Sequence, residues 1–154
     1  MNMLTDIQSG IAEDVPQVNF YKTQGCLVVP IQTELSKEAA LHIQTKLLQT
    51  IHAKSYQGAV IDLSGINIID SGLWDIISDT AIMINMLGFK TIVTGLSPGV
   101  VASIIEVSDD TERIKTAMNI EDAIESLLRL IDNNEKKDKL TKQKKEKHKV
   151  AEKK

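Results

Sequence analysis

The amino-acid sequence predicts an α/β fold with a mostly parallel β-sheet, in the order β-β-α-β-α-β-α-β-α. Short apolar runs typical of buried strands alternate with segments whose apolar residues recur at helical spacing. Residues that favour helix starts and ends fall at the junctions between these segments. The aliphatic content is high and the aromatic content is only 3%, so we expect one domain with a core of Ile, Leu, Val and Met side chains.

The first third of the chain predicts two strands and a helix. The strands are residues 18–22 and 25–31, and Pro30 indicates an edge strand or a bulge, because proline cannot donate a hydrogen bond to the ladder. Residues 35–56 predict a helix for which Ser36 is a suitable N-cap. The apolar positions that we expect on one face of this helix are Ala40, Ile43, Leu47, Leu48 and Ile51.

The middle of the chain predicts a central strand followed by the clearest helix. Residues 59–64 form a short apolar run suited to a strand that is covered on both faces. The helix after it ends at Gly88, a good terminator. Its predicted apolar face consists of Leu73, Ile76, Ile77, Thr80, Ala81, Ile84 and Leu87.

The last third predicts two more strands, each followed by a helix. Residues 90–95 form the first strand; Ser97 is then the N-cap and Pro98 the first helical residue, where proline has no N–H to lose. Residues 113–118 form the last strand, and Asn119 caps the final helix. The apolar positions of the two helices are Val100, Val101, Ile104 and Ile105, then Ile124, Leu127, Leu128 and Ile131.

Composition divides the chain into a short extension (1–15), a domain (16–133) and a lysine-rich tail (134–154). Residues 135–154 hold ten lysines and four acidic residues, a net charge of +6; because the chain totals −3, residues 1–134 carry −9. The acidic domain argues against nucleic acid as its ligand. The tail has too few apolar residues to offset chain entropy, so we expect it to be disordered or a frayed helix in the monomer. It is either a solvated segment or a weak contact for RNA, lipid head groups or an acidic partner.

Several classes of protein are excluded by composition. The single cysteine, Cys26, allows no intrachain disulfide and lies in an apolar run, which predicts a buried side chain. The N-terminus lacks the basic start and apolar stretch of a signal peptide. No segment approaches the roughly 20 apolar residues of a membrane span. We therefore expect a cytoplasmic protein with no membrane partner.

Signatures of catalysis are weak. The chain has no GxxxxGK[ST] or GxGxxG loop and no GxSxG elbow. His42 and His52 lie ten residues apart on one helix and point to different sides, while His148 lies in the tail. We therefore expect no metal, no cofactor and no catalytic residue. Asp62 ends a strand as the phospho-accepting aspartate of a receiver domain would, but the first strand is not followed by the acidic pair that a receiver needs.

The strand-to-helix junction INIIDSGLWDII, residues 66–77, is the remaining candidate site. Asp70 or Ser71 can cap the helix that starts here, which needs no further function. A phosphoryl group on Ser71 would also be tolerated, because a helix N-terminus has free N–H groups and a positive dipole end. It would add about −1.5 to −2 charges beside Asp70, and a partner docked on the neutral hydroxyl would be repelled. The residues alone leave both interpretations open.

Three stretches of the chain resemble one family, the STAS domains of anti-sigma-factor antagonists. VIDLSGINIIDSGLWDIISD is similar to the phosphorylatable strand–loop–helix of these domains. LGFKTIVTGLSPGVVASIIE is similar to the STAS domains of the stressosome, and LVVPIQTELSKEAALHIQTKLL to the start of its short RsbS-like scaffold proteins. The resemblance covers residues 18–130 and implies the STAS fold and a non-catalytic scaffold of a bacterial general stress response.

The resemblance also implies roles for residues and partners. Ser71 would be the phosphoacceptor, and Asp70, Gly72 and Trp74 would contact a partner beside it. Ser103 matches a second acceptor position of the R-type paralogues, although a small helix residue is the other interpretation. The implied partners are an R-type sensor paralogue (RsbR-like), a switch kinase (RsbT-like), a phosphatase (RsbX-like) and further copies in a large complex. The unphosphorylated assembly would hold the kinase, and phosphorylation would release it.

Two other functions stay open. The first is a conventional antagonist, monomeric or dimeric, that binds an anti-sigma kinase; Gly72 after the serine is closer to that group. The second is a small flavodoxin-like enzyme or nucleotide binder, which predicts turnover or a bound cofactor.

Overall fold

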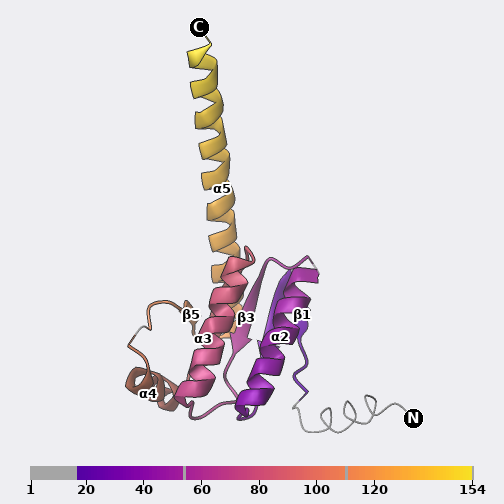
Figure 1. Ribbon diagram of the computed structural model, residues 1–154, viewed down its shortest axis with the longest axis vertical. Coiled ribbons are helices and arrows are strands. Elements are labelled where there is room, and N and C mark those ends of the chain that lie inside the picture. Colours follow the sequence, from indigo (N-terminus) through magenta and orange to yellow (C-terminus); the bar gives the residue numbers. More distant parts are fainter. Residues whose placement is uncertain (1–16, 54, 110, 154) are drawn as a thin grey trace, which may run out of the picture.

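The computed structural model describes residues 17–53, 55–109 and 111–153, and its elements follow the predicted order (Figure 1). The extension expected over residues 1–15 lies outside the described residues. None of the described helices combines the length and the apolar character that crossing a membrane requires.

Five strands form one sheet in the spatial order β1-β2-β3-β4-β5. They are β1 (Tyr21–Thr23), β2 (Cys26–Pro30), β3 (Gly58–Asp62), β4 (Lys90–Thr94) and β5 (Thr116–Ala117). β1 is antiparallel to β2, and the other neighbouring pairs are parallel. The mostly parallel sheet predicted from the sequence is confirmed.

Alternation of side chains along the strands divides the core into two layers. Leu27 and Ile61 belong to the layer covered by α2 (Lys37–Ala53), α3 (Ser71–Met86) and α4 (Pro98–Val107). The opposite layer contains Cys26, Val28, Val60 and Ile92 and is covered by α5 (Ile120–Glu152). All five residues of β3 are buried, as expected for a central strand with helices on both faces.

Helix starts follow the predicted capping residues. Each of these caps accepts a hydrogen bond from a backbone N–H three residues ahead, which satisfies one of the free donors of the first turn. The pairs are Ala39 N to Ser36 Oγ (3.2 Å), Val100 N to Ser97 Oγ (3.3 Å) and Asp122 N to Asn119 Oδ1 (2.8 Å).

The two edge strands differ from prediction. β1 covers Tyr21–Thr23 instead of residues 18–22. Gln24 and Gly25, both with positive φ (49° and 80°), make the two-residue hairpin turn that pairs Thr23 with Cys26. The last strand shrinks from residues 113–118 to Thr116–Ala117.

Pro30 does not lie in an edge strand, contrary to expectation, since β2 pairs with both β1 and β3. The pairing between β1 and β2 ends at Tyr21 opposite Val28, however, and so does not extend to Pro30. No strand therefore needs the N–H that Pro30 lacks on that side.

The last helix continues through the tail, which we expected to be disordered or a frayed helix, and ends at Glu152. The tail contains no Gly or Pro and is rich in Lys, which has high helix propensity. An ion pair one turn apart, Lys136 with Asp132 (3.0 Å), adds to it. All described residues after Ile131 are exposed, and the helix projects away from the body (Figure 1).

Deletion of residues 135–154 should leave the domain folded, because this part of α5 is exposed throughout. We expect the midpoint of thermal unfolding to change by less than the ~4–8 °C that 1 kcal/mol produces in a small domain. The helical circular dichroism signal should fall at the same time. A larger loss of thermal stability would mean that the tail packs on the domain.

Candidate functional site

The candidate site lies at the edge of the sheet where the parallel strands end. Pro30, Asp62 and Thr94 are in register there as the last residues of β2, β3 and β4. Residues 63–70 lead from β3 along this edge to the start of α3. In parallel α/β sheets this edge is where loops gather and ligands bind.

Two buried isoleucines anchor the loop over residues 63–70. Ile66 and Ile69 belong to the core, and Ile66 N donates to Leu63 O (2.9 Å), closing a tight turn. Ile68 lies between them and is 66% exposed. The loop is therefore fixed on its inner side and presents an apolar side chain outward.

Neighbouring segments approach the loop closely. A Cβ on Gly65 would lie 2.3 Å from Gln32 Cα, and one on Gly95 would lie 2.4 Å from Asp62 Oδ1. Only glycine fits such approaches. Asp62 accepts from Ser64 N (3.1 Å) and Ser64 Oγ (3.0 Å), so its carboxylate holds the beginning of the loop.

Asp70 is the residue that caps α3. Its backbone is extended (φ −88°, ψ 167°), its Oδ1 accepts from Leu73 N (2.8 Å) and its carbonyl from Trp74 N (3.0 Å). Ser71 is the first residue of the helix and is exposed. Within the described residues the Ser71 hydroxyl has no hydrogen-bond partner, and the side chain is open to solvent.

We expected Trp74 to contact a partner, but its side chain is buried. Only 3% of Trp74 is exposed, and its ring packs in the core with Leu73. A side chain so placed offers no surface to a partner. Gly72 is partly exposed, and a Cβ there would meet only Asp70 Oδ1 at an ordinary 3.4 Å. Glycine is thus not required by space at this position.

Ser103 lies in α4 and is half-buried. Its Oγ donates to Gly99 O one turn earlier (2.8 Å), which is the usual arrangement of a serine inside a helix. This geometry is that of the small helix residue considered above, and nothing in it tests modification.

An acidic and partly apolar surface surrounds Ser71. The exposed side of α3 carries Asp75 and Asp79, and the helix contains no lysine or arginine. A Cβ on Gly99 would lie 2.8 Å from Asn67 O, so the loop touches the first turn of α4. The large apolar side chains exposed on these two segments are Ile68, Val101, Ile105 and Val107. Val101 and Ile105 are two of the apolar positions named from the sequence for this helix, and both are exposed in the structure.

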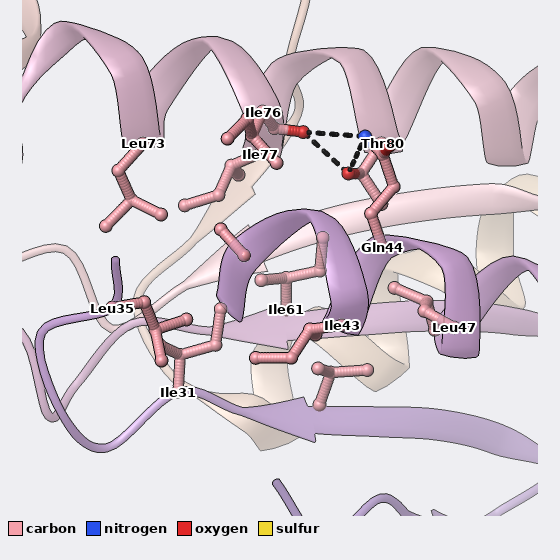
Figure 2. Close-up of a pocket in the computed structure, with 12 residues that line it drawn as sticks. Ile31, Leu35, Ile43, Gln44, Leu47, Ile61, Leu73, Ile76, Ile77 and Thr80 are labelled. Carbon is pink, nitrogen blue, oxygen red and sulfur yellow. Dashed lines mark hydrogen bonds between the residues drawn. The ribbon is translucent and has the colours of Figure 1, made fainter. Parts of the chain in front are cut away.

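α3 is held in place by a polar contact with α2. Gln44 Nε2 donates to Thr80 Oγ1 (2.9 Å) and Ile76 O (3.4 Å), and Thr80 Oγ1 donates to Ile76 O. Figure 2 shows this contact above the aliphatic layer between the helices and the sheet. The cavity beneath Gln44 measures about 20 Å³, room for one water. It is packed core rather than a ligand site.

The remaining candidates stay apart from this edge. His42 and His52 are exposed on α2. Cys26 is buried, and desolvation raises the pKa of its thiol. The described residues contain no group of three His, Cys, Asp or Glu side chains that could hold a metal ion.

A family model described as STAS domain matches residues 17–123. Among solved structures, a Ser-to-Glu variant of RsbS from Moorella thermoacetica is 24% identical, with a TM-score of 0.67 over 75% of this chain and 97% of that one. A structure titled as the molecular architecture of the stressosome is 25% identical (TM-score 0.65; 73% and 97% covered). Phosphorylated SpoIIAA of Bacillus is 17% identical (TM-score 0.54; 72% and 99%). No protein of curated function matches the sequence.

Gly95 and Gly88 provide a matched pair of substitutions. Both have positive φ (75° and 92°), but a Cβ on Gly88 meets nothing within 4 Å. Gly88→Ala should cost ~1–2 kcal/mol from the left-handed backbone alone. Gly95→Ala should cost clearly more, because its Cβ would strike Asp62 and Ser64. If urea unfolding showed the same loss of unfolding free energy for Gly88→Ala and Gly95→Ala, the segment around Asp62 and Ser64 would move aside easily and would not be held as described.

Proposed function

The chain belongs to the STAS domain family, and on that premise we propose that it is a non-catalytic, cytoplasmic phospho-switch and scaffold of a stressosome. The observation that carries the proposal is the exposed, unpartnered hydroxyl of Ser71 at the start of α3. The likeness to RsbS and to the stressosome structure supports it.

The capping geometry explains how Ser71 could be modified without loss of the fold. Asp70 already supplies the cap through Leu73 N, so the serine hydroxyl is not needed to hold the helix. A phosphate on Ser71 would meet the remaining free N–H groups and the positive end of the helix dipole. The domain would remain folded in both states, as a reversible switch requires.

The charge of the surface explains how modification could alter binding. A phosphate adds about −1.5 to −2 charges to a surface that already carries Asp70, Asp75 and Asp79. A partner that packs on Ile68 and approaches the neutral hydroxyl would lose its contact. We propose that this partner is a switch kinase (RsbT-like), held before phosphorylation and released after it.

The other proposed partners follow from the same role. An R-type paralogue (RsbR-like) and further copies of the chain would build the large complex, and a phosphatase (RsbX-like) would reset Ser71. The likeness to the stressosome structure supports this set.

A conventional anti-sigma-factor antagonist is the second candidate. Gly72, directly after the serine, and the likeness to SpoIIAA favour it. The switch would work in the same way, but the protein would act as a monomer or dimer. Light scattering separates the two: a stressosome component should form a very large particle, alone or with its R-type partner, whereas a conventional antagonist should not.

Ser71 should be the main phosphoacceptor for the cognate kinase, because its hydroxyl is exposed and unpartnered. Phosphopeptide mapping should find the label on Ser71 and lose it in Ser71→Ala. Ser103→Ala and Ser78→Ala are matched controls, since both serines are half-buried in helices. Phosphate label that persists undiminished in Ser71→Ala would contradict the assignment of Ser71 as the main phosphoacceptor.

Ser71→Asp should remain folded and bind the kinase less tightly than the wild type. A carboxylate at the first helical residue is stabilised by ~0.3–1 kcal/mol at the positive end of the dipole. Circular dichroism checks the fold, and calorimetric titration of the kinase checks the affinity. The control is Ser71→Ala, which carries no charge and should bind as the wild type does; equal affinity for Ser71→Asp and Ser71→Ala would contradict the electrostatic mechanism.

A further inference from the structure

The two halves of α5 carry opposite charges. Residues 120–135, the acidic half, contain five acidic residues and one arginine, a net charge of −4. Residues 136–153, the basic half, contain nine lysines and three acidic residues, a net charge of +6. The acidic half packs on the sheet, whereas the basic half is exposed throughout and projects from the body (Figure 1).

An open groove follows the acidic half of α5. Its lining on this helix runs from Glu121 to Glu135, a distance of ~21 Å along the axis, and its volume is about 590 Å³. Gln24 and Gln57, from two turns of the body, complete the lining. A groove of this length and shape suits an extended element such as a helix. Its apolar lining consists of Ile124, Leu128 and Ile131.

The carboxylates along the groove can accept further cations. Glu125 and Asp132 each pair with a cation one turn away, yet their side chains are 62% and 63% exposed. Glu121 and Glu135 form no ion pair with any described residue. Each carboxylate has two acceptor oxygens, so the groove offers four sites to a positively charged partner.

The spacing of lysines in the basic half mirrors the spacing of these four carboxylates. The carboxylates are separated by four, seven and three residues, and the lysines by three, seven and four. Steps of three, four and seven residues keep side chains on one face of a helix. The reversed order is the one that an antiparallel pair of identical helices requires. The lysines are Lys139, Lys142, Lys149 and Lys153.

We infer that two copies of the chain pair through α5 in antiparallel orientation, with the basic half of each copy in the groove of the other. The register that matches the charges places Lys137 of one copy opposite Lys137 of the other, on a two-fold axis. Val150, 63% exposed in the single chain, then faces the apolar lining at Ile124. Each ion pair occurs twice. The pairs are Glu121 with Lys153, Glu125 with Lys149, Asp132 with Lys142 and Glu135 with Lys139.

The partner is a second copy because the chain's own basic half cannot reach its own groove. Residues 120–152 form one continuous helix without Gly or Pro, so the basic half extends away from the acidic half. Exposed ion pairs are individually weak, and the pair should separate on dilution. α3 and α5 cover opposite faces of the sheet, so the pairing leaves Ser71 uncovered and does not rest on the proposed function.

Cysteine cross-linking tests the register. Leu128 of one copy faces Glu146 of the other, and neither belongs to a matched ion pair. Leu128→Cys protein mixed with Glu146→Cys protein, concentrated at ~0.01 M salt where the screening length is ~30 Å, should give a covalent dimer with a short bismaleimide. Each variant alone should give none, because its two cysteines would lie ~27 Å apart in this register. Cys26 is buried and does not compete.

Two controls accompany the mixture. Ser126 is exposed and lies ~200° around the helix from Leu128, so Ser126→Cys protein mixed with Glu146→Cys protein should not cross-link. At ~1 M salt, where the screening length is ~3 Å, the cross-link of the first mixture should be lost.

A charge swap separates the matched pairing from non-specific attraction. Lys142→Glu and Lys149→Glu, added to the Glu146→Cys protein, should reduce the cross-link several-fold. Glu125→Lys and Asp132→Lys, added to its cross-linking partner, should restore it. All four positions are exposed, so the fold should tolerate the changes.

Absence of a covalent dimer in the first mixture at low salt would overturn the inference and leave the basic half to a different chain. Equal cross-linking in the Ser126→Cys control, or a charge swap that does not restore the cross-link, would also overturn it. A covalent dimer from Leu128→Cys protein alone would show parallel helices and contradict the antiparallel pairing. These readouts do not involve Ser71, so they are distinguishable from a failure of the proposed switch.

Discussion

The pairing of β3 with its two neighbours is the constraint from which the site follows. Each residue of β3 is buried, so a shift of one residue would exchange the side chains meant for the two core layers. The register therefore fixes Asp62 at the edge of the sheet beside Pro30 and Thr94. From that point the loop has only one route to α3, between segments that approach it at Gly65 and Gly95.

Asp70 and Ser71, neighbours at the start of α3, differ in what they contribute to the helix. Asp70 holds the first turn through its carboxylate and its carbonyl. Ser71, one residue later, contributes nothing to that hold and faces solvent. Adjacent positions thus differ in what they do for the fold: the Asp70 side chain caps the helix, and the Ser71 side chain is exposed.

The fold was predictable wherever its cause is local. Capping at Ser36, Ser97 and Asn119 depends on a few neighbouring residues, and the alternation of strands and helices depends on periodicity. STAS family membership followed from residues that lie together in the chain. The position of Ser71 at a helix start was predictable for the same reason, while its modification remains a prediction.

The errors arose where the deciding partner is distant or absent. The resemblance implied that Trp74 contacts a partner, but the folded core buries it. Ile105 is an apolar helix position in the sequence, but no part of the described chain covers it. The close approach of Gly65 to Gln32 has no sequence signal, because the two segments meet only in the folded sheet. For the tail, the lack of apolar residues predicted exclusion from the core but left open whether it is disordered or helical; the structure shows a helix through Glu152.

The projecting part of α5 has a geometric consequence for any assembly of copies. Ile124 and Leu127 face the sheet, and Lys142 and Lys145 follow them by 18 residues, about five turns, on the same side. Rods that carry lysines like these repel one another within the ~8 Å screening length of physiological salt. Neighbours that associate through their bodies lower this repulsion by splaying their rods apart. Splayed rods on adjoining bodies impose curvature, and a curved layer of identical units closes on itself instead of growing flat.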